Sequence, residues 1–264
     1  MNQRTVTYLP QRNIFGFLGA EESNLLTTLR TCHRDFSIML PMIDGAFQAP
    51  IGHIAIPVND DHKRTVLCLY LYVHGQMYFS VACLLRCHLS NSLASTRKAI
   101  DATLTAYRLI EEPATLPQYE AGDFSYQFVK RYVEKARKKD ASLYPLAVDL
   151  LKFHDLCSQF GSHADIATFI HKIAILQTDN PDQEMMTVGM FQPPDSKEEM
   201  RRYMVETFLA FVAMMKVFSS FVVSIATKFD SGPWVKQIDQ MAAACYKEAR
   251  ELDAAIDGAR AKKP

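Results

Sequence analysis

The stretch 208-FLAFVAMMKVFSSFVVSIA-226 decides the fold, because its 19 residues carry only one charge, Lys216. A run of this length fits either a helix that crosses a bilayer or a helix buried on all sides in a protein core. A lysine at the centre of a membrane-spanning helix would cost about 3 kcal/mol. Cations flank the run on both sides, so they favour no orientation. We therefore expect a core helix, and a membrane-associated protein built around 208–226 is the alternative.

The rest of the chain also has the residue pattern of helices. Apolar residues recur at steps of three and four along most of the sequence, which is the spacing of one face of a helix. Only 10 of the 264 residues are glycine, fewer than the usual ~7%, and parallel α/β folds need tight turns repeatedly. The sequence predicts a mainly α protein, a multi-helix bundle that forms a single domain over residues 1–264.

Several helix boundaries can be expected from capping residues and prolines. Ser196 and Glu199 form a capping box that opens the helix containing 208–226. A first helix is expected over 22–40, closed by Pro41, after an irregular N-terminal segment at 1–20. Frequent proline and glycine predict an irregular crossing segment at 41–60.

Residues 60–112 keep helical spacing without a clear stop. A single helix of about 47 of these residues would be about 70 Å long, whereas a compact chain of this size is roughly 47 Å across. We expect a break at 90–92, where the sequence Ser-Asn-Ser offers side chains that compete for backbone hydrogen bonds. In the first half, the stripe expected to face the core is Leu67, Leu71, His74, Tyr78, Val81 and Leu85.

Shorter elements follow. Helices are expected over 124–139 and from about His163 onward, and a third is expected between them, with Ser142 as its N-cap, Pro145 in its first turn and Gly161 just after its end. Residues 173–177 and 186–191 flank a segment rich in proline and could pair as a small β-hairpin. The last helix is expected over 234–259.

Charge and cysteine usage exclude some classes of function. The chain has 29 cations and 29 anions, so it lacks the basic excess typical of proteins that bind nucleic acids. Its six cysteines are scattered through apolar helical patterns, as buried reduced thiols are. The N-terminus has no apolar run followed by a small-residue cleavage site. These features predict a soluble, cytoplasmic protein, and they allow a homo-oligomer.

The best candidate site is 154-HDLCSQFGSHADIATFIH-171, where a helix, a glycine and a second helix form a corner. Corners of this kind bring histidine and carboxylate side chains together in helical metal or acid–base sites. His154, Asp155 and His163 are the candidate metal ligands, and His163 and Asp165 are candidate catalytic residues. The alternative is that these side chains only pack and cap the corner.

The adjacent pair His154–Asp155 resembles two of the metal ligands of HD-type phosphohydrolases. The other ligands of that family, an earlier histidine and a later aspartate, have no match here, so no family is assigned. Motifs for nucleotide binding, zinc peptidases and serine hydrolases are absent as well, and no cofactor can be named.

A second candidate is the pair Arg97 and Asp101, one turn apart on the same helical face. Such a pair could bind a polar ligand or could only fix the register of two helices. The leading hypothesis is a helical-bundle protein that acts by binding a protein partner or a small ligand. The alternative activity is a metal-dependent hydrolase or nuclease that uses the cluster at 154–171.

Overall fold

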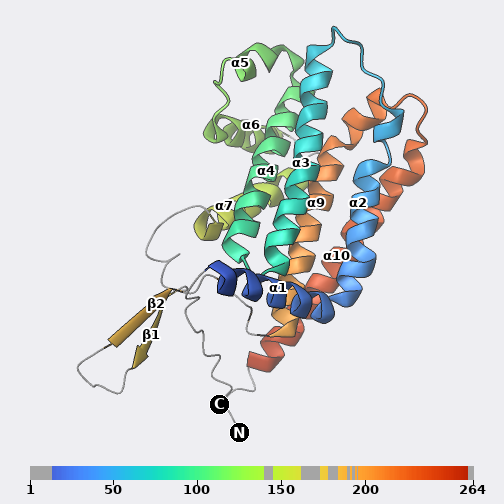
Figure 1. Cartoon of the computed structure of the whole chain (residues 1–264). Coiled ribbons are helices and arrows are strands. Elements are labelled where there is room, and N and C mark those ends of the chain that lie inside the picture. Colours follow the sequence, from blue (N-terminus) through green and yellow to red (C-terminus); the bar gives the residue numbers. More distant parts are fainter. Residues whose placement is uncertain are drawn as a thin grey trace.

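The computed structural model describes residues 14–139, 145–161, 173–177, 184–188, 191, 194 and 196–260. Within these residues the chain is mainly α-helical, as predicted. The helices are α1 (Ile14–Thr31), α2 (Leu40–Gln48), α3 (Asp61–Leu85), α4 (Leu89–Glu111), α5 (Leu116–Glu120), α6 (Tyr126–Lys139), α7 (Pro145–Gly161), α9 (Lys197–Ile225) and α10 (Ser231–Arg260), with short helical turns η1 (Asp35–Met39), η2 (Ile51–His53) and η3 (Pro113–Thr115). The long helices run side by side, and α1 lies across one end (Figure 1).

Helix α9 is the centre of the bundle. It packs against α10, α4, α3, α7 and α2, and 15 of its 29 residues are buried. Its lone central charge, Lys216, reaches the outside and pairs with Asp239 of α10, with 2.7 Å between Nζ and Oδ1. The stretch 208–226 is thus surrounded by protein, which is the arrangement expected of a core helix.

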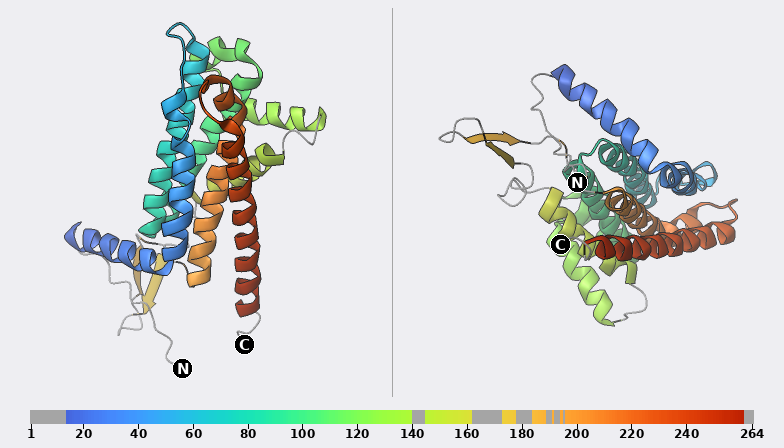
Figure 2. Two further views of the ribbon diagram at one scale, coloured as in Figure 1. Left: turned by 90° about the vertical axis from the view of Figure 1, so that its right-hand side faces the viewer. Right: turned by 90° about the horizontal axis from the view of Figure 1, so that it is seen from below.

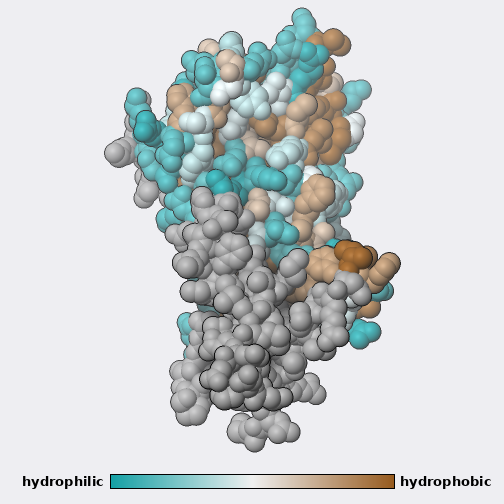
Figure 3. Space-filling model, turned by 60° about the vertical axis from the view of Figure 1, so that its left-hand side comes forward, coloured by the Kyte–Doolittle hydropathy of each residue, from teal (hydrophilic) through white to brown (hydrophobic). Residues whose placement is uncertain are grey.

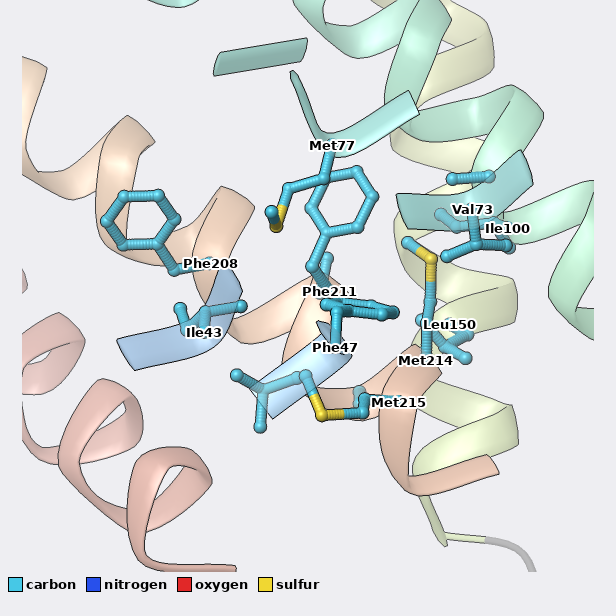
Figure 4. Close-up of a cluster of buried hydrophobic side chains, with 14 of the residues drawn as sticks. Ile43, Phe47, Val73, Met77, Ile100, Leu150, Phe208, Phe211, Met214 and Met215 are labelled. Carbon is cyan, nitrogen blue, oxygen red and sulfur yellow. The ribbon is translucent and has the colours of Figure 1, made fainter. Parts of the chain in front are cut away.

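The core gathers side chains from α9 and from four helices around it (Figure 4). Each buried phenylalanine or methionine contributes about 1.5–3 kcal/mol relative to an exposed one, so this contact region supplies much of the stability. Its members are Ile43 and Phe47 of α2, Val73 and Met77 of α3, Ile100 of α4, Leu150 of α7, and Phe208, Phe211, Met214 and Met215 of α9.

Two helix starts follow from their capping residues. The backbone N–H of Glu199 donates to Oγ of Ser196 at 3.0 Å, so the predicted cap of α9 is present. Likewise the N–H of Lys63 donates to Asp60 Oδ1 at 3.0 Å at the start of α3. Each cap satisfies an amide that has no partner within its own helix.

The break between α3 and α4 lies at 86–88, so the predicted break at 90–92 was wrong. Cys87 has a φ of 63°, which ends α3 and reverses the chain. Ser92 lies inside α4, and its hydroxyl is 2.9 Å from that of Ser80 on α3. Because Ser92 finds a partner across the helix pair, it does not compete for the backbone.

The N-terminal expectations also need correction. Residues 14–20, within the segment predicted to be irregular, belong to α1, which ends at Thr31. Pro41 lies in the first turn of α2 and does not close a helix, because a proline there loses no helical hydrogen bond. The predicted crossing segment at 41–60 is therefore helical up to Gln48 and again at η2, and residues 54–60 make the crossing.

The inward stripe of α3 was only partly predicted. His74, Val81 and Leu85 of the predicted stripe are buried, but Leu71 and Tyr78 are 43% and 48% exposed. The other buried side chains of α3 are Val66, Tyr70, Val73, Met77, Ser80 and Leu84. Helix α3 is apolar on several sides, so its periodicity alone does not select the face that packs inward.

Strands β1 (Ile173–Gln177) and β2 (Glu184–Val188) pair antiparallel, with Ile175 opposite Met186. The first strand coincides with the prediction. The second begins two residues earlier than expected and ends before Phe191.

A buried ion pair joins α9 to the segment before α2. Asp35 is only 2% exposed, and Arg201 Nε donates to its Oδ2 at 3.0 Å. The same guanidinium donates to Glu248 of α10. A buried carboxylate that loses its cation keeps the cost of desolvation without compensation, so Arg201 fixes how three segments meet.

We predict that Arg201→Met lowers the free energy of unfolding by about 3–5 kcal/mol, because Asp35 would stay buried without a cation. The matched control is Arg202→Met on the same helix, whose partners Glu206 and Asp253 are 30% and 47% exposed. Pairs of that kind contribute about 1 kcal/mol or less. Urea unfolding of both variants checks the difference, and equal losses would contradict it.

Candidate functional site

The two pairs of residues singled out in the sequence meet where α4, α6 and α7 come together. Arg97 and Asp101 project from α4, and His154 and Asp155 project from α7. The atom Nε2 of His154 is 3.0 Å from Oδ1 of Asp101 and 3.3 Å from Nε of Arg97. Helix α4 packs directly against α7, so the i to i+4 spacing of Arg97 and Asp101 aims both side chains at one histidine.

The His154 side chain is almost fully enclosed, with 2% exposure. The ring of Tyr126 from α6 stacks on its imidazole, with ring centres 3.7 Å apart and planes inclined by 17°. A ligand therefore reaches the imidazole only if Tyr126 moves. This enclosure makes His154 a poor point of attack for a substrate.

The two contacts of Nε2 need different tautomers of the His154 ring. A protonated Nε2 donates to Asp101 Oδ1, a buried atom that otherwise has no hydrogen-bond partner. An unprotonated Nε2 accepts from Arg97 instead, and the proton then sits on Nδ1, which is 3.4 Å from Ser158 Oγ and 3.6 Å from Asp155 Oδ1. Each tautomer of His154 therefore has polar neighbours within the protein.

Asp155 faces outward and is held by α6. Lys130 Nζ lies 3.0 Å from its Oδ2, and the hydroxyl of Tyr126 donates to its Oδ1 at 3.2 Å. Partial burial raises the pKa of Asp155, but the hydrogen bonds from Lys130 and Tyr126 outweigh it and lower that pKa below 3.8. Burial and the nearby Asp155 carboxylate raise the pKa of Tyr126. Asp155 therefore stays ionised and Tyr126 neutral near pH 7.

Tyr126 and Lys130 were not identified as site residues from the sequence. They lie one turn apart on α6. The C-terminal half of this helix is rich in basic residues, which is typical of a solvent-exposed helix end. The only available signal was an aromatic residue four positions before a lysine, and that spacing is common on helices. Their role depends on how α6 packs against α7.

The predicted metal site is only partly described. His163 and Asp165 lie outside the described residues, as does the corner after Gly161. Among the described residues, no group of three histidine, cysteine or acidic side chains is placed to hold a metal ion. Arg97 beside Nε2 of His154 would also repel a cation at that nitrogen. A metal centre here would need His163 or Asp165 to complete it.

A second candidate site, missed in the sequence, is a groove between η1, α2 and α10. It has a volume of about 320 Å³, and its apolar lining includes Met39, Met42 and Met241. Asp35 and Glu248, both bound to Arg201, lie at its polar edge. The π-helical turn η1 forms one wall. Methionine side chains adapt to irregular shapes, so this groove could take an apolar group of varied form.

The chain matches no family model, no curated protein and no solved structure.

We predict that His154→Ala destabilises the fold by about 2–4 kcal/mol, since it opens a cavity beneath Tyr126 and leaves Asp101 without a donor. Asp155→Asn is the control, because the Asp155 side chain is 52% exposed and its ion pair contributes about 1 kcal/mol or less. Thermal unfolding measures both. A His154→Ala variant as stable as the parent would show that this histidine is not a structural junction.

The metal hypothesis has a separate test. If His154, Asp155 and His163 bind a metal, elemental analysis of the untagged, folded protein should find zinc, iron or manganese near one equivalent. The positions of Arg97 and Tyr126 lead us to expect no stoichiometric metal. One equivalent that is lost in His163→Ala but retained in Lys152→Ala would overturn this expectation.

Proposed function

We propose that this protein is an interaction module that binds a protein partner through the outward face of α3. We call this surface the α3 face, and it consists of Cys68, Leu71, Tyr72, Gly75, Tyr78, Phe79 and Ala82. These residues recur at steps of three and four, so they share one side of the helix. The side opposite to them carries the buried Val66, Tyr70, Val73 and Met77.

The exposure of this surface is what carries the proposal. Phe79 is 64% exposed, Tyr72 45% and Leu71 43%. From Thr65 to Ala82 the helix has no Asp, Glu, Lys or Arg, and its one histidine, His74, is buried and bound to Asp44. Figure 3 shows hydrophobic residues, in brown, toward the right-hand edge of the upper part of the bundle, with hydrophilic residues among them. Contiguous exposed apolar surface of this kind marks interaction sites.

A partner protein fits this surface better than a bilayer around the bundle. Helices α3 and α9 are long and apolar enough to cross a membrane, but 61% of the apolar window of α9 is buried inside the protein, against 39% for α3. The outer side of α10, a neighbour of α9, carries the exposed Lys236, Asp239, Lys247 and Arg250. A surrounding bilayer would have to accommodate these charges, whereas a partner on α3 would not.

The same proposal takes the protein to be soluble and cytoplasmic. Its six cysteines are all free thiols, which suits a reducing compartment. Burial raises the pKa of Cys157 and of Cys245 to about 12, so these two thiols stay protonated and unreactive near pH 7. They support a structural role for the cysteines.

Site-specific photo-crosslinking tests the proposal. A photoreactive phenylalanine analogue placed at Tyr72 or Phe79 in cells should give discrete adducts whose protein component mass spectrometry identifies. The same analogue at Lys247, exposed on α10, should give none of them. Adducts that form equally from Lys247, or no adducts from α3, would contradict the proposal.

A further inference from the structure

The residues of the α3 face are arranged almost symmetrically about Gly75. Cys68 and Ala82, both small, lie seven positions before and after it. Leu71 and Phe79 lie four positions away, and Tyr72 and Tyr78 lie three positions away. Read in either direction from Gly75, the face presents an aromatic residue, a large apolar residue and then a small one.

When one copy of such a surface is turned end over end on another, residues at equal distances before and after Gly75 lie opposite one another. Interfaces between two identical subunits are formed in this way, since each patch meets its own copy across a two-fold axis. We infer that the partner is a second copy of this chain, with α3 crossing α3 antiparallel at Gly75. This inference rests on the proposed function of the α3 face and names its partner.

The helical positions determine which residues would meet. At 100° per residue, Tyr72 and Phe79 lie about 60° and 40° to one side of Gly75, and Leu71 and Tyr78 lie about 40° and 60° to the other. The two-fold axis reverses the chain direction but keeps each flank on its own side. Phe79 therefore contacts Tyr72 of the second copy, and Leu71 contacts Tyr78 of the second copy.

The Tyr72 flank also offers space for a projecting ring. A hollow of about 420 Å³ lies between α3 and α5, lined by Thr65, Cys68, Leu69 and Tyr72, by Tyr119 of α5, and by the charged Asp61, Arg64 and Glu120. Phe79 is the most exposed of the large apolar side chains on α3, at 64%. In the two-fold arrangement, Phe79 of each copy lies at the end of the other copy's hollow, and large residues that fill such hollows dominate binding energy.

Charge and shape both suit a second copy. Near a two-fold axis a charged residue lies close to the same residue of the other copy, and the two like charges repel. Between Thr65 and Ala82, α3 carries no Asp, Glu, Lys or Arg that would cause such repulsion. Gly75 lets the two backbones approach closely. Helix α1 projects below this side of the bundle (Figure 2), so the helices cross at an inclined angle, as most packed helices do. A single crossing of this kind buries less than the ~1,600 Å² of a standard interface, which predicts a weak, concentration-dependent dimer.

Sedimentation equilibrium of the full chain is the first test. The mass should rise with concentration from 29.9 kDa towards twice that value. Phe79→Glu should weaken self-association at least about tenfold, the effect of losing one interface hot spot. The matched control Val223→Glu, at a 41% exposed position of α9, should leave it unchanged. Circular dichroism confirms that each variant is folded.

A disulfide test locates the axis. Gly75→Cys combined with Cys68→Ser should form a covalent dimer under mild oxidation, because residue 75 faces itself only at this two-fold axis. Apart from the adjacent backbone of α3 itself, a Cβ at Gly75 meets no heavy atom within 4 Å, so the substitution fits the monomer. Lys247→Cys with Cys68→Ser should form no covalent dimer under the same oxidation.

The outcomes separate the two proposals. A chain that is monomeric at all concentrations, or a dimer that persists unchanged in Phe79→Glu, overturns the inference. If that monomeric chain still gives a defined photo-adduct with another protein from Tyr72 or Phe79, the proposed function stands with a different partner. If it gives no adduct from α3, both proposals fail.

Discussion

The structure depends on the burial of one apolar helix by its neighbours. Helix α9 offers large side chains in nearly every direction, so a single flanking helix could not cover it, and α2, α3, α4, α7 and α10 surround it. Burying each large residue contributes about 1.5–3 kcal/mol, and this gain offsets the entropy lost in ordering the surrounding helices. The neighbours in turn need only one apolar side. Helix α3 departs from this rule, and its uncovered apolar side is the most informative feature of the surface.

Polar groups inside the bundle set the register of its helices. Asp35 is neutralised by Arg201, the hydroxyls of Ser80, Ser92 and Thr96 bind one another between α3 and α4, and His154 bridges α4 and α7. Each group would be costly to bury alone, so each allows one placement of its helix. The same physics explains why residues that suggest chemistry in the sequence can meet for structural reasons. His154 gathers Arg97, Asp101 and Asp155, yet Tyr126 covers it.

The sequence was most informative where local rules decide the outcome. The helical class, the Ser196 cap and the core role of 208–226 follow from periodicity and capping, which involve neighbouring residues only. The helix break at 86–88, the start of α2 at Leu40 and the outward side of α3 depend on packing between distant segments. Arg97, Asp101, His154 and Asp155 were identified singly, but their meeting depends on how α4 packs against α7, and periodicity does not specify that contact. Tyr126 and Asp35 carried no local signal, because their importance comes from partners far along the chain.

Hydrogen exchange of the protein in buffer without detergent tests the central claim most directly. If α9 is the buried core of a bundle that folds in water, its amides from Phe208 to Ile225 should exchange slowest of all, at the rate of global unfolding. The amides of α6, at the edge of the bundle, should exchange sooner. Fast exchange throughout α9 that slows only when detergent or lipid is added would contradict the account.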